Sequence, residues 1–313
     1  MTQNDPERWA RRRRWRLPLV PLIAAVVAWA GLLVFMYPSA AAWVSQLNQS
    51  ALVDSYTEKV EAGVSPTAAK QLAAARAYNK ALNSGASLEA GHRLPTGMGS
   101  STDPKLNYWN LLRATPLDVM ARLRIASIDL DLPVYHGTSD DTLERGVGHL
   151  EGTSLPVGGI GTHAVLTAHR GLATATLFTH LDKVEVGDAI TIEVMDEVLK
   201  YRVVSSIVVD PDQTESLRAD PAKDLITLVT CTPLGINSQR ILVTAERVTP
   251  TPQSDIDAAH RRPDVPGFPW WIVIVSGGFV AAAGYVYWSG RPSTSGPSPG
   301  RRGMRRTHRQ RRH

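Results

Sequence analysis

The chain has 313 residues, 43% of them hydrophobic and 20% charged, which allows one sizeable folded domain with additional segments. Its net charge of +5 comes from the two ends: six Lys or Arg and two acidic residues precede Leu17, and eight Arg and no acid follow Trp288. Residues 38–268 hold 20 basic and 27 acidic residues, which argues against a nucleic-acid-binding body.

An uncharged apolar run adjoins each basic end. Residues 17–37 and 269–288 contain 21 and 20 residues, and Trp and Tyr lie at both ends of the second run. A helix rises 1.5 Å per residue, so either run can cross a hydrocarbon core of about 30 Å. Aromatic residues at the ends of a span are typical of membrane interfaces. We therefore predict a transmembrane helix at each end.

Arginine clusters beside a membrane span favour the cytoplasm. This predicts that tails 1–16 and 289–313 are cytoplasmic and that the acidic middle is extracellular, in a two-span protein of the cell membrane. A cleaved signal peptide is the alternative for the first run, and Ser39-Ala40-Ala41 resembles a cleavage site. However, the run is longer than a usual signal-peptide core, so we predict an uncleaved anchor that contacts membrane lipid.

The next region, residues 38–120, is expected to be mainly helical. Residues 40–83 are rich in Ala with few breakers, and Pro66 can open a second helix after Ser65. Residues 83–104 are rich in Gly, Ser, Thr and Pro, which predicts a loop. Its position before the β region makes it a candidate flap, with residues 96–105 resembling a lid.

Residues 121–250 have the alternating pattern of short strands punctuated by glycines. Many short strands with few helices predict a mainly β domain, a barrel or a sandwich. We expect short inserted helices at 140–145 and 174–181, a short helix near 106–113, and a linker at 251–268. The expected strands are 122–128, 163–168, 189–195, 199–209, 225–230 and 240–247.

The single cysteine, Cys231, ends the strand-like run at 225–230, and Arg240 follows on the next predicted strand. His169 ends another apolar strand. If both strand ends lie at the same rim, the thiol and the imidazole meet, and a guanidinium lies close by. Taken singly, an isolated Cys is more often inert core filler, and a lone His or Arg is more often structural. One cysteine and scattered histidines offer no metal-ligand set such as C-x2-C, so we expect no metal and no cofactor.

The chain resembles sortases, the cysteine transpeptidases of Gram-positive cell surfaces. The family's TLxTC motif is matched by Thr227-Leu228-Val229-Thr230-Cys231, its His by His169 and its Arg by Arg240. Phrases such as Pro133-Val134-Tyr135-His136-Gly137 resemble class C, the pilus-assembling branch, which commonly has a second membrane span. The resemblance implies a sortase-type barrel of eight strands over residues 121–250.

The resemblance also implies a reaction at an LPxTG-type sorting signal. Cys231 would be the nucleophile that forms a thioester, His169 the general acid and base, and Arg240 the donor to the substrate carbonyl or oxyanion. Thr230 would contact substrate. The amine acceptor would be a pilin lysine in pilus polymerisation, or a cell-wall precursor amine in a housekeeping-type sortase. A catalytically inactive binding or assembly module is the alternative from another class, and the presence of all three residues argues against it.

Class C sortases usually carry an Asp-Pro-aromatic lid over the site. The corresponding residues are Asp103 and Pro104, but Lys105 replaces the aromatic ring. These residues resemble the lid, or they form only a turn before the next segment. If the lid is weak, deletion of residues 101–105 should change the rate of peptide cleavage little, whereas a many-fold rise would show that these residues cover the site.

Overall fold

The structure is a computed structural model, and it describes residues 15–64, 66–83, 86–87, 96–97, 100–101, 106–114, 118–213, 215–259, 261–263 and 266–291. The chain divides into two compact units. One takes in Met1–Phe35 and Ile272–His313, and the other takes in Met36–Trp271.

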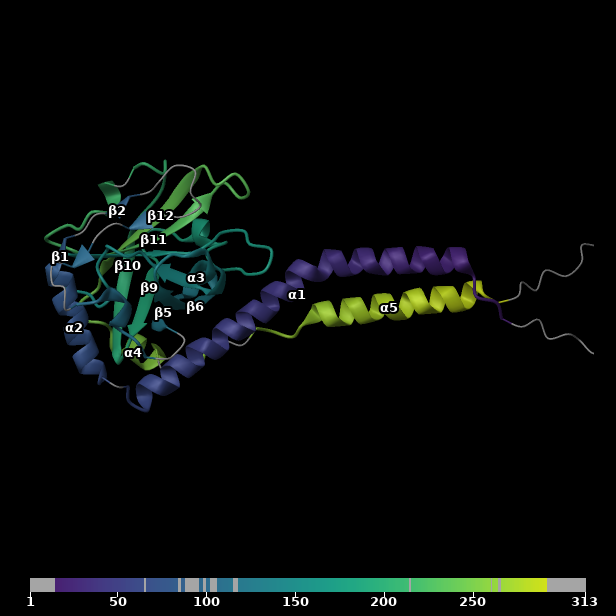
Figure 1. Ribbon diagram of the computed structural model, residues 1–313, viewed down its shortest axis with the longest axis horizontal. Helices are drawn as coiled ribbons and strands as arrows, with labels where there is room; N and C mark the ends of the chain where they lie inside the picture. The colour runs from purple at the N-terminus through teal and green to yellow at the C-terminus, as the bar shows by residue number, and fades with distance from the viewer. Residues whose placement is uncertain are drawn as a thin grey trace, which may run out of the picture. The chain divides into compact units, whose positions relative to one another are not determined.

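Two helices of the described chain are long and apolar enough to cross a membrane, α1 (Leu19–Glu61) and α5 (Trp270–Ser289). Within the first unit they pack against each other (Figure 1): the Trp29 and Phe279 rings meet edge to face at 5.5 Å. The Trp29 indole N–H also donates to the Val275 carbonyl over 3.3 Å. Both helices therefore fit membrane association.

The second unit contains a closed barrel of eight strands in the order β10-β12-β11-β8-β7-β6-β5-β9. Most neighbours are antiparallel, but β8 runs parallel to β11 and β6 parallel to β7. Closing the sheet leaves no exposed strand edge. This is the expected eight-stranded fold. The strands are β5 (Val119–Ile125), β6 (Leu130–His136), β7 (Val147–His149), β8 (Thr162–Thr167), β9 (Ala189–Val194), β10 (Glu197–Val209), β11 (Asp224–Thr232) and β12 (Gln239–Arg247).

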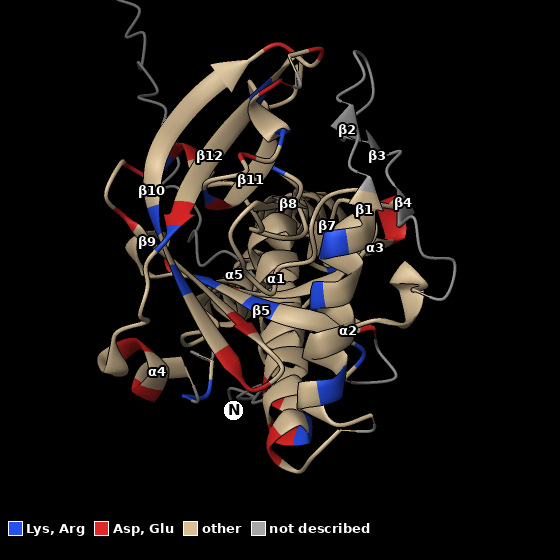
Figure 2. Cartoon of the chain, turned by 90° about the vertical axis from the view of Figure 1, so that its left-hand side faces the viewer, with Lys and Arg blue, Asp and Glu red and all other residues tan. Residues whose placement is uncertain are grey.

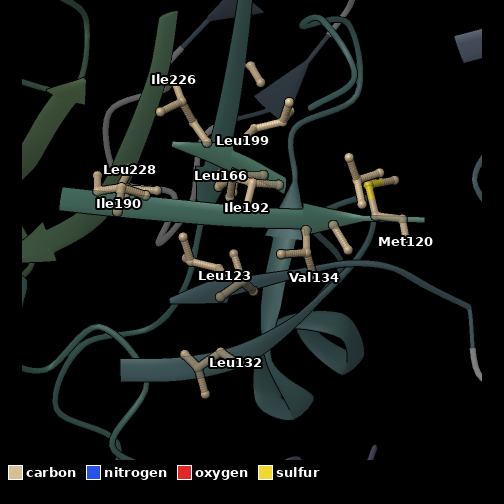
Figure 3. Packing of buried hydrophobic residues seen from close by; sticks show 14 of the residues in the cluster. Met120, Leu123, Leu132, Val134, Leu166, Ile190, Ile192, Leu199, Ile226 and Leu228 are labelled. Carbon is tan, nitrogen blue, oxygen red and sulfur yellow. The ribbon is translucent and has the colours of Figure 1, made fainter. Parts of the chain in front are cut away.

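The interior of the barrel is filled by aliphatic side chains from alternate positions of these strands. Leu123, Ile192 and Leu228 are fully buried there, and Figure 3 shows them packed with their neighbours. Side chains on a strand alternate between the two faces, so the residues between these positions point outward. Each strand thus presents one apolar face to the core and leaves the other face for helices, loops and the site.

Helices and short 3-10 turns cover the barrel. Helix α2 (Ala68–Ala81) buries Leu72 and Tyr78, and the later part of α1 contributes Tyr56. The Tyr56 hydroxyl donates to the Met120 carbonyl (3.1 Å) and accepts from the Met195 N–H (2.7 Å). The other described elements are β1 (Leu82–Asn83), β2 (Ala86–Ser87), β3 (Thr96–Gly97), β4 (Ser100–Ser101), η1 (Tyr108–Asn110), η2 (Ala126–Ile128), α3 (Asp140–Arg145), η3 (Leu181–Lys183), η4 (Glu215–Leu217) and α4 (Gln253–Ala259).

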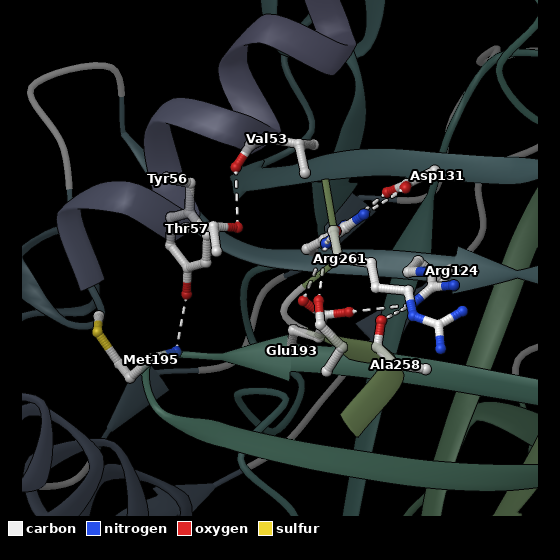
Figure 4. A network of polar contacts seen from close by, with 11 residues as sticks. Val53, Tyr56, Thr57, Arg124, Asp131, Glu193, Met195, Ala258 and Arg261 are labelled. Atoms are coloured by element: carbon white, nitrogen blue, oxygen red, sulfur yellow. Dashed lines mark hydrogen bonds and ion pairs between the residues drawn. The ribbon is translucent and has the colours of Figure 1, made fainter. Parts of the chain in front are cut away.

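A buried polar network holds the segment after α4 against the barrel (Figure 4). The Arg122 guanidinium pairs with Asp131 and with Glu193, and it donates to the Ala259 and Arg261 carbonyls over 3.0 Å each. Burial raises the pKa of Glu193 to about 7, against the lowering effect of Arg122. The network thus binds part of the chain between β12 and α5 to strand β5 of the barrel.

Charged residues of both signs are distributed over the described elements. Figure 2 shows basic residues along α2 and acidic residues on α4. Charges of both signs therefore lie on the helices that surround the barrel.

Two local predictions from the sequence are wrong. The expected helix at 174–181 is a series of turns that ends in η3, because the Phe178 N–H donates to the His169 carbonyl instead of to a helical neighbour. Near 106–113 only η1 forms, because the next residue, Leu111, is extended with a ψ of 149°, and Leu112 after it has a left-handed φ of 53°. Strands β6 and β7 were not among the expected strands.

Candidate active site

Cys231 and Arg240 are opposite each other on neighbouring strands. The antiparallel register of β11 and β12 pairs these two residues directly. Both are buried, with 5% of Cys231 and 1% of Arg240 exposed. Side chains directly opposite in an antiparallel pair point to the same face, with Cβ atoms about 5 Å apart. The thiol and the base of the arginine side chain are therefore adjacent.

His169 lies on the other side of Cys231. Strand β8 is parallel to β11, with Thr167 paired to Val229. The pairing continues beyond this point, because the Ala168 N–H donates to the Val229 carbonyl over 3.3 Å. Strand β8 ends at Thr167, and an unbroken register would set His169, two residues beyond it, beside Cys231. Neighbouring strands are about 4.8 Å apart, so the three predicted residues form one row, with Arg240 on β12, Cys231 on β11 and His169 in the segment just after β8.

The row lies on the outer face of the barrel. By the alternation of side chains, Cys231 shares a face with Val229, and Arg240 shares a face with Leu242. Val229 and Leu242 belong to a small apolar cluster separate from the barrel interior, together with Leu217 of η4. The connection between β10 and β11 thus covers the sheet next to the row. This arrangement places a thiol, an imidazole and a guanidinium at one rim of the sheet.

The backbone of the β11–β12 turn holds the Arg240 guanidinium. Its Nη1 donates to the Asn237 carbonyl over 2.9 Å and to the Gln239 carbonyl over 3.0 Å. Asn237 has a left-handed φ of 58°, a conformation that Asn tolerates better than most residues. These bonds restrict the orientation of the guanidinium, so a cation is held close to Cys231.

The other predicted site residues are placed differently. Thr230 is 1% exposed, and its hydroxyl donates to the Ala168 carbonyl over 2.8 Å. It lies between β11 and β8 on the face opposite to that of Cys231. Its predicted contact with substrate stays a prediction. Asp103 and Pro104 lie outside the described residues.

His149, a second histidine at the end of a barrel strand, is fully buried away from the row. Its Nε2–H donates to the Ser154 carbonyl over 2.8 Å, and its Nδ1 lies 3.0 Å from the Tyr108 hydroxyl. Burial lowers the pKa of His149 to about 4. It is a neutral structural residue in this fold. Among the described residues, no group of three or more His, Cys, Asp or Glu could hold a metal ion.

Arg170 is a residue of the site that the sequence did not single out. Its guanidinium donates to the Thr232 hydroxyl over 3.0 Å, one residue beyond Cys231. The only signal in the sequence is its place directly after His169, which by itself does not distinguish it from a surface arginine. Its contacts appear only when the two strands are brought together.

Known proteins share this domain. A family model for the sortase domain matches residues 123–248. Sortase D of Bacillus subtilis (strain 168) is 31% identical over 157 residues, which cover 49% of this chain and 76% of that protein.

Solved structures of sortases are also similar to this chain. Sortase C-1 from Actinomyces oris shares 46% identity and a TM-score of 0.52, over 58% of this chain and 97% of that one. Sortase C from Streptococcus pneumoniae is 36% identical with a TM-score of 0.54, over 64% of this chain and 98% of that one. The chain therefore belongs to the sortase family of cysteine transpeptidases, and its structural neighbours include the class C, or pilus, sortases.

Proposed function

We propose that this sortase uses Cys231, His169 and Arg240 to cleave an LPxTG-type sorting signal. The new carboxyl end is then transferred to an amine, for which a pilin lysine is the first candidate. The observations that support the proposal are the direct pairing of Cys231 with Arg240 on β11 and β12 and the parallel pairing of β11 with β8, the strand that leads into His169. A nucleophile, a proton carrier and a cation on adjacent strands satisfy the needs of acyl transfer.

In the first half-reaction, the Cys231 thiolate attacks the carbonyl carbon of the substrate threonine. Arg240 donates to the carbonyl oxygen as it gains negative charge. The C–N bond to the following glycine then breaks, His169 protonates the departing amine, and a thioester to Cys231 remains. Removing a single oxyanion donor lowers kcat about 10²–10³-fold in other acyl-transfer enzymes. We therefore expect replacement of Arg240 to lower kcat by a similar factor.

In the second half-reaction, an incoming amine attacks the thioester carbonyl. His169 accepts a proton from this amine, the C–S bond breaks, and Cys231 leaves as a thiolate. The products are an amide bond and the regenerated enzyme. A pilin lysine is the preferred acceptor because pilus sortases are among the structural neighbours, and the structure of the Streptococcus pneumoniae enzyme gives insight into its pilin substrate specificity.

A cell-wall precursor amine is the second candidate acceptor. The relatives also include Sortase A of Bacillus anthracis, 31% identical over 130 residues that cover 60% of that protein, so the matches are not confined to class C sortases. Both candidates use the same acyl-enzyme and differ only in the amine. The choice is therefore a question of the acceptor and leaves the assignment of Cys231 unchanged.

The full chain in detergent, incubated with an LPxTG-type peptide and two competing amines, tests the acceptor. One amine is a lysine-containing pilin-like peptide, and the other is a short glycine or diaminopimelate peptide that represents the cell wall. Tandem mass spectrometry then identifies the bond formed. An isopeptide bond to the lysine side chain supports pilus assembly. Transfer only to the cell-wall peptide supports the housekeeping reaction, and Cys231→Ala must abolish both.

We further propose that α1 and α5 anchor the enzyme, with tails 1–16 and 289–313 in the cytoplasm and residues 38–268 outside. The arginine-rich tails support this orientation, because such clusters favour the cytoplasm. Single cysteines placed in each tail and in the domain, in a Cys231→Ala background, test it in intact cells. A membrane-impermeant maleimide should label only the cysteine in the domain, and labelling of either tail would contradict the orientation.

A further inference from the structure

The segment that follows β8, His169-Arg170-Gly171, is tied down by the side chain of Arg170. Three of its nitrogens have partners: Nε donates to the Thr179 carbonyl (3.2 Å), Nη1 to the Thr232 hydroxyl (3.0 Å), and Nη2 pairs with the Asp182 carboxylate (2.9 Å). The Arg170 side chain is only 9% exposed. Arg170 directly follows His169 in the chain, so its side chain joins the His169 segment to β11 and to the loop before η3.

The bond between Arg170 and Thr232 joins the residues that directly follow His169 and Cys231 in the chain. Thr232 is the last residue of β11, and Arg170 lies three residues beyond the end of β8. Because side chains on a strand alternate between faces, the Thr232 side chain points away from the face of β11 that holds the Cys231 thiol. The guanidinium thus links the ends of β8 and β11 next to the site.

A second contact joins the same segment to the turn between Cys231 and Arg240. Gly171 has a φ of 74°, and a Cβ atom at this position would lie 2.4 Å from Cδ2 of Leu234. The absence of a side chain therefore lets the β11–β12 turn approach the segment closely. The Gly171 N–H donates to the Thr179 hydroxyl over 3.1 Å, which fixes the segment from its other side.

We propose that Arg170 is a positioning residue, which sets the distance and orientation between the His169 imidazole and the Cys231 thiol through its bond to Thr232. The proposal rests on the proposed function of these two residues. Proton transfer needs a heavy-atom separation of about 2.6–3.2 Å, and a displacement of 1 Å can cost about 10²-fold in rate. Lysine cannot replace Arg170, because one ammonium group cannot reach three acceptors that the planar guanidinium serves from separate nitrogens.

The test uses two nearly isosteric variants of the full chain in detergent. Thr232→Val keeps the shape of the side chain and removes the hydroxyl, whereas Thr232→Ser keeps the hydroxyl. We expect Thr232→Val to lower kcat for peptide cleavage about tenfold, with KM changed less than twofold and a Tm close to wild type. Thr232→Ser should retain at least half of the wild-type kcat.

Arg170→Lys should lower kcat about 10–100-fold, since it disturbs all three contacts. Asp182→Asn should cost less than threefold, because the Asp182 side chain is 45% exposed and such ion pairs contribute little. Arg202→Lys is the matched control: Arg202 is an exposed arginine on β10 that donates to the Gly187 carbonyl, away from the row. It should leave kcat unchanged.

The rate of Cys231 alkylation by iodoacetamide as a function of pH supplies a readout that a purely structural role would not move. A changed separation between thiol and imidazole should shift this profile in Thr232→Val and in Arg170→Lys, and not in Thr232→Ser or Arg202→Lys. The proposal is overturned if Thr232→Val and Arg170→Lys keep both kcat and the profile of wild type, or if kcat falls only in proportion to folded protein. If the wild-type chain does not cleave the peptide, the proposed function fails, and the alkylation profile alone still decides the role of Arg170.

Discussion

Two regions of the barrel hold an imidazole among polar partners, and they differ in what that imidazole is available to do. In one, His149 is fully buried, its Nε2–H is given to the Ser154 carbonyl, and Tyr108 lies beside its other nitrogen. In the other, half-buried His169 follows the end of β8 next to Cys231. A histidine inside the fold stabilises a local conformation, whereas one at a strand end beside a thiol can exchange a proton with substrate.

The comparison predicts the largest effect at His169. Replacing it with Ala should lower kcat/KM for peptide cleavage about 10³-fold, since general acid and base catalysis contributes about 10²–10⁴-fold. The Tm should fall by no more than a few degrees, because the side chain lies at the edge of the fold. Steady-state kinetics and a thermal melt on the same preparation check both. A variant with wild-type kcat/KM would remove His169 from the mechanism.

Arg240→Lys is the next largest change. It keeps a positive charge but loses the planar guanidinium that Nη1 fixes to the Asn237 and Gln239 carbonyls. We expect kcat to fall about 10²-fold and KM to change much less, because the interaction strengthens in the transition state. If instead KM rises with kcat intact, Arg240 binds the ground state only and our assignment of an oxyanion donor is wrong.

For His149 we expect a loss of stability with little loss of activity. His149→Phe leaves the buried Ser154 carbonyl without its donor, whereas the Tyr108 hydroxyl keeps the Gly137 N–H and the backbone carbonyl of residue 149. Because leaving a buried polar group unpaired costs about 1–3 kcal/mol, chemical denaturation should show a loss of about 2 kcal/mol in the free energy of unfolding. The kcat of the folded fraction should stay within threefold of wild type. A loss of kcat as large as that of His169→Ala, in a fully folded sample, would mean that the two regions are not distinct.

The smallest effect is a dependence of stability on pH. Burial lowers the pKa of His149 to about 4, below the ordinary value of 6.5. The unfolded chain then binds a proton at a higher pH than the folded chain does. The contribution of His149 to stability is therefore complete above pH 6.5 and is lost as the pH falls towards 4.

At pH 5 this loss should be about 2 kcal/mol relative to pH 8. The free energy of unfolding, measured at both values for wild type and for His149→Phe, isolates the contribution. The difference between the two proteins should be about 2 kcal/mol smaller at pH 5. A difference that does not change with pH would show that His149 is not held neutral by burial.

The strand ends that carry the site were predictable from the sequence. The alternating runs place Cys231 and His169 at or just beyond the last residue of a strand, and β11 and β8 end within two residues of the predicted bounds. The prediction that the two ends share a rim depends on β8 and β11 being parallel neighbours. Strands so far apart in the chain give no local signal of that pairing.

Other features depend on tertiary contacts that local patterns do not contain. Strand β6 carries Pro133, a residue that argues against an interior strand, and β7 is only three residues long. The polar partners of Arg170 come from β11 and from the loop before η3, so the sequence alone does not predict these contacts. The resemblance to sortases supplied the strand number that periodicity alone did not.

The central claim is that Cys231 forms a thioester with a cleaved sorting signal, and intact mass spectrometry tests it most directly. The full chain in detergent is mixed with an LPxTG-type peptide without an added amine and quenched in acid within the first turnovers. We predict an adduct with the mass of the peptide up to its threonine, absent from Cys231→Ala and released by hydroxylamine. Peptide cleavage that persists in Cys231→Ala, or an adduct that resists hydroxylamine, would contradict the account.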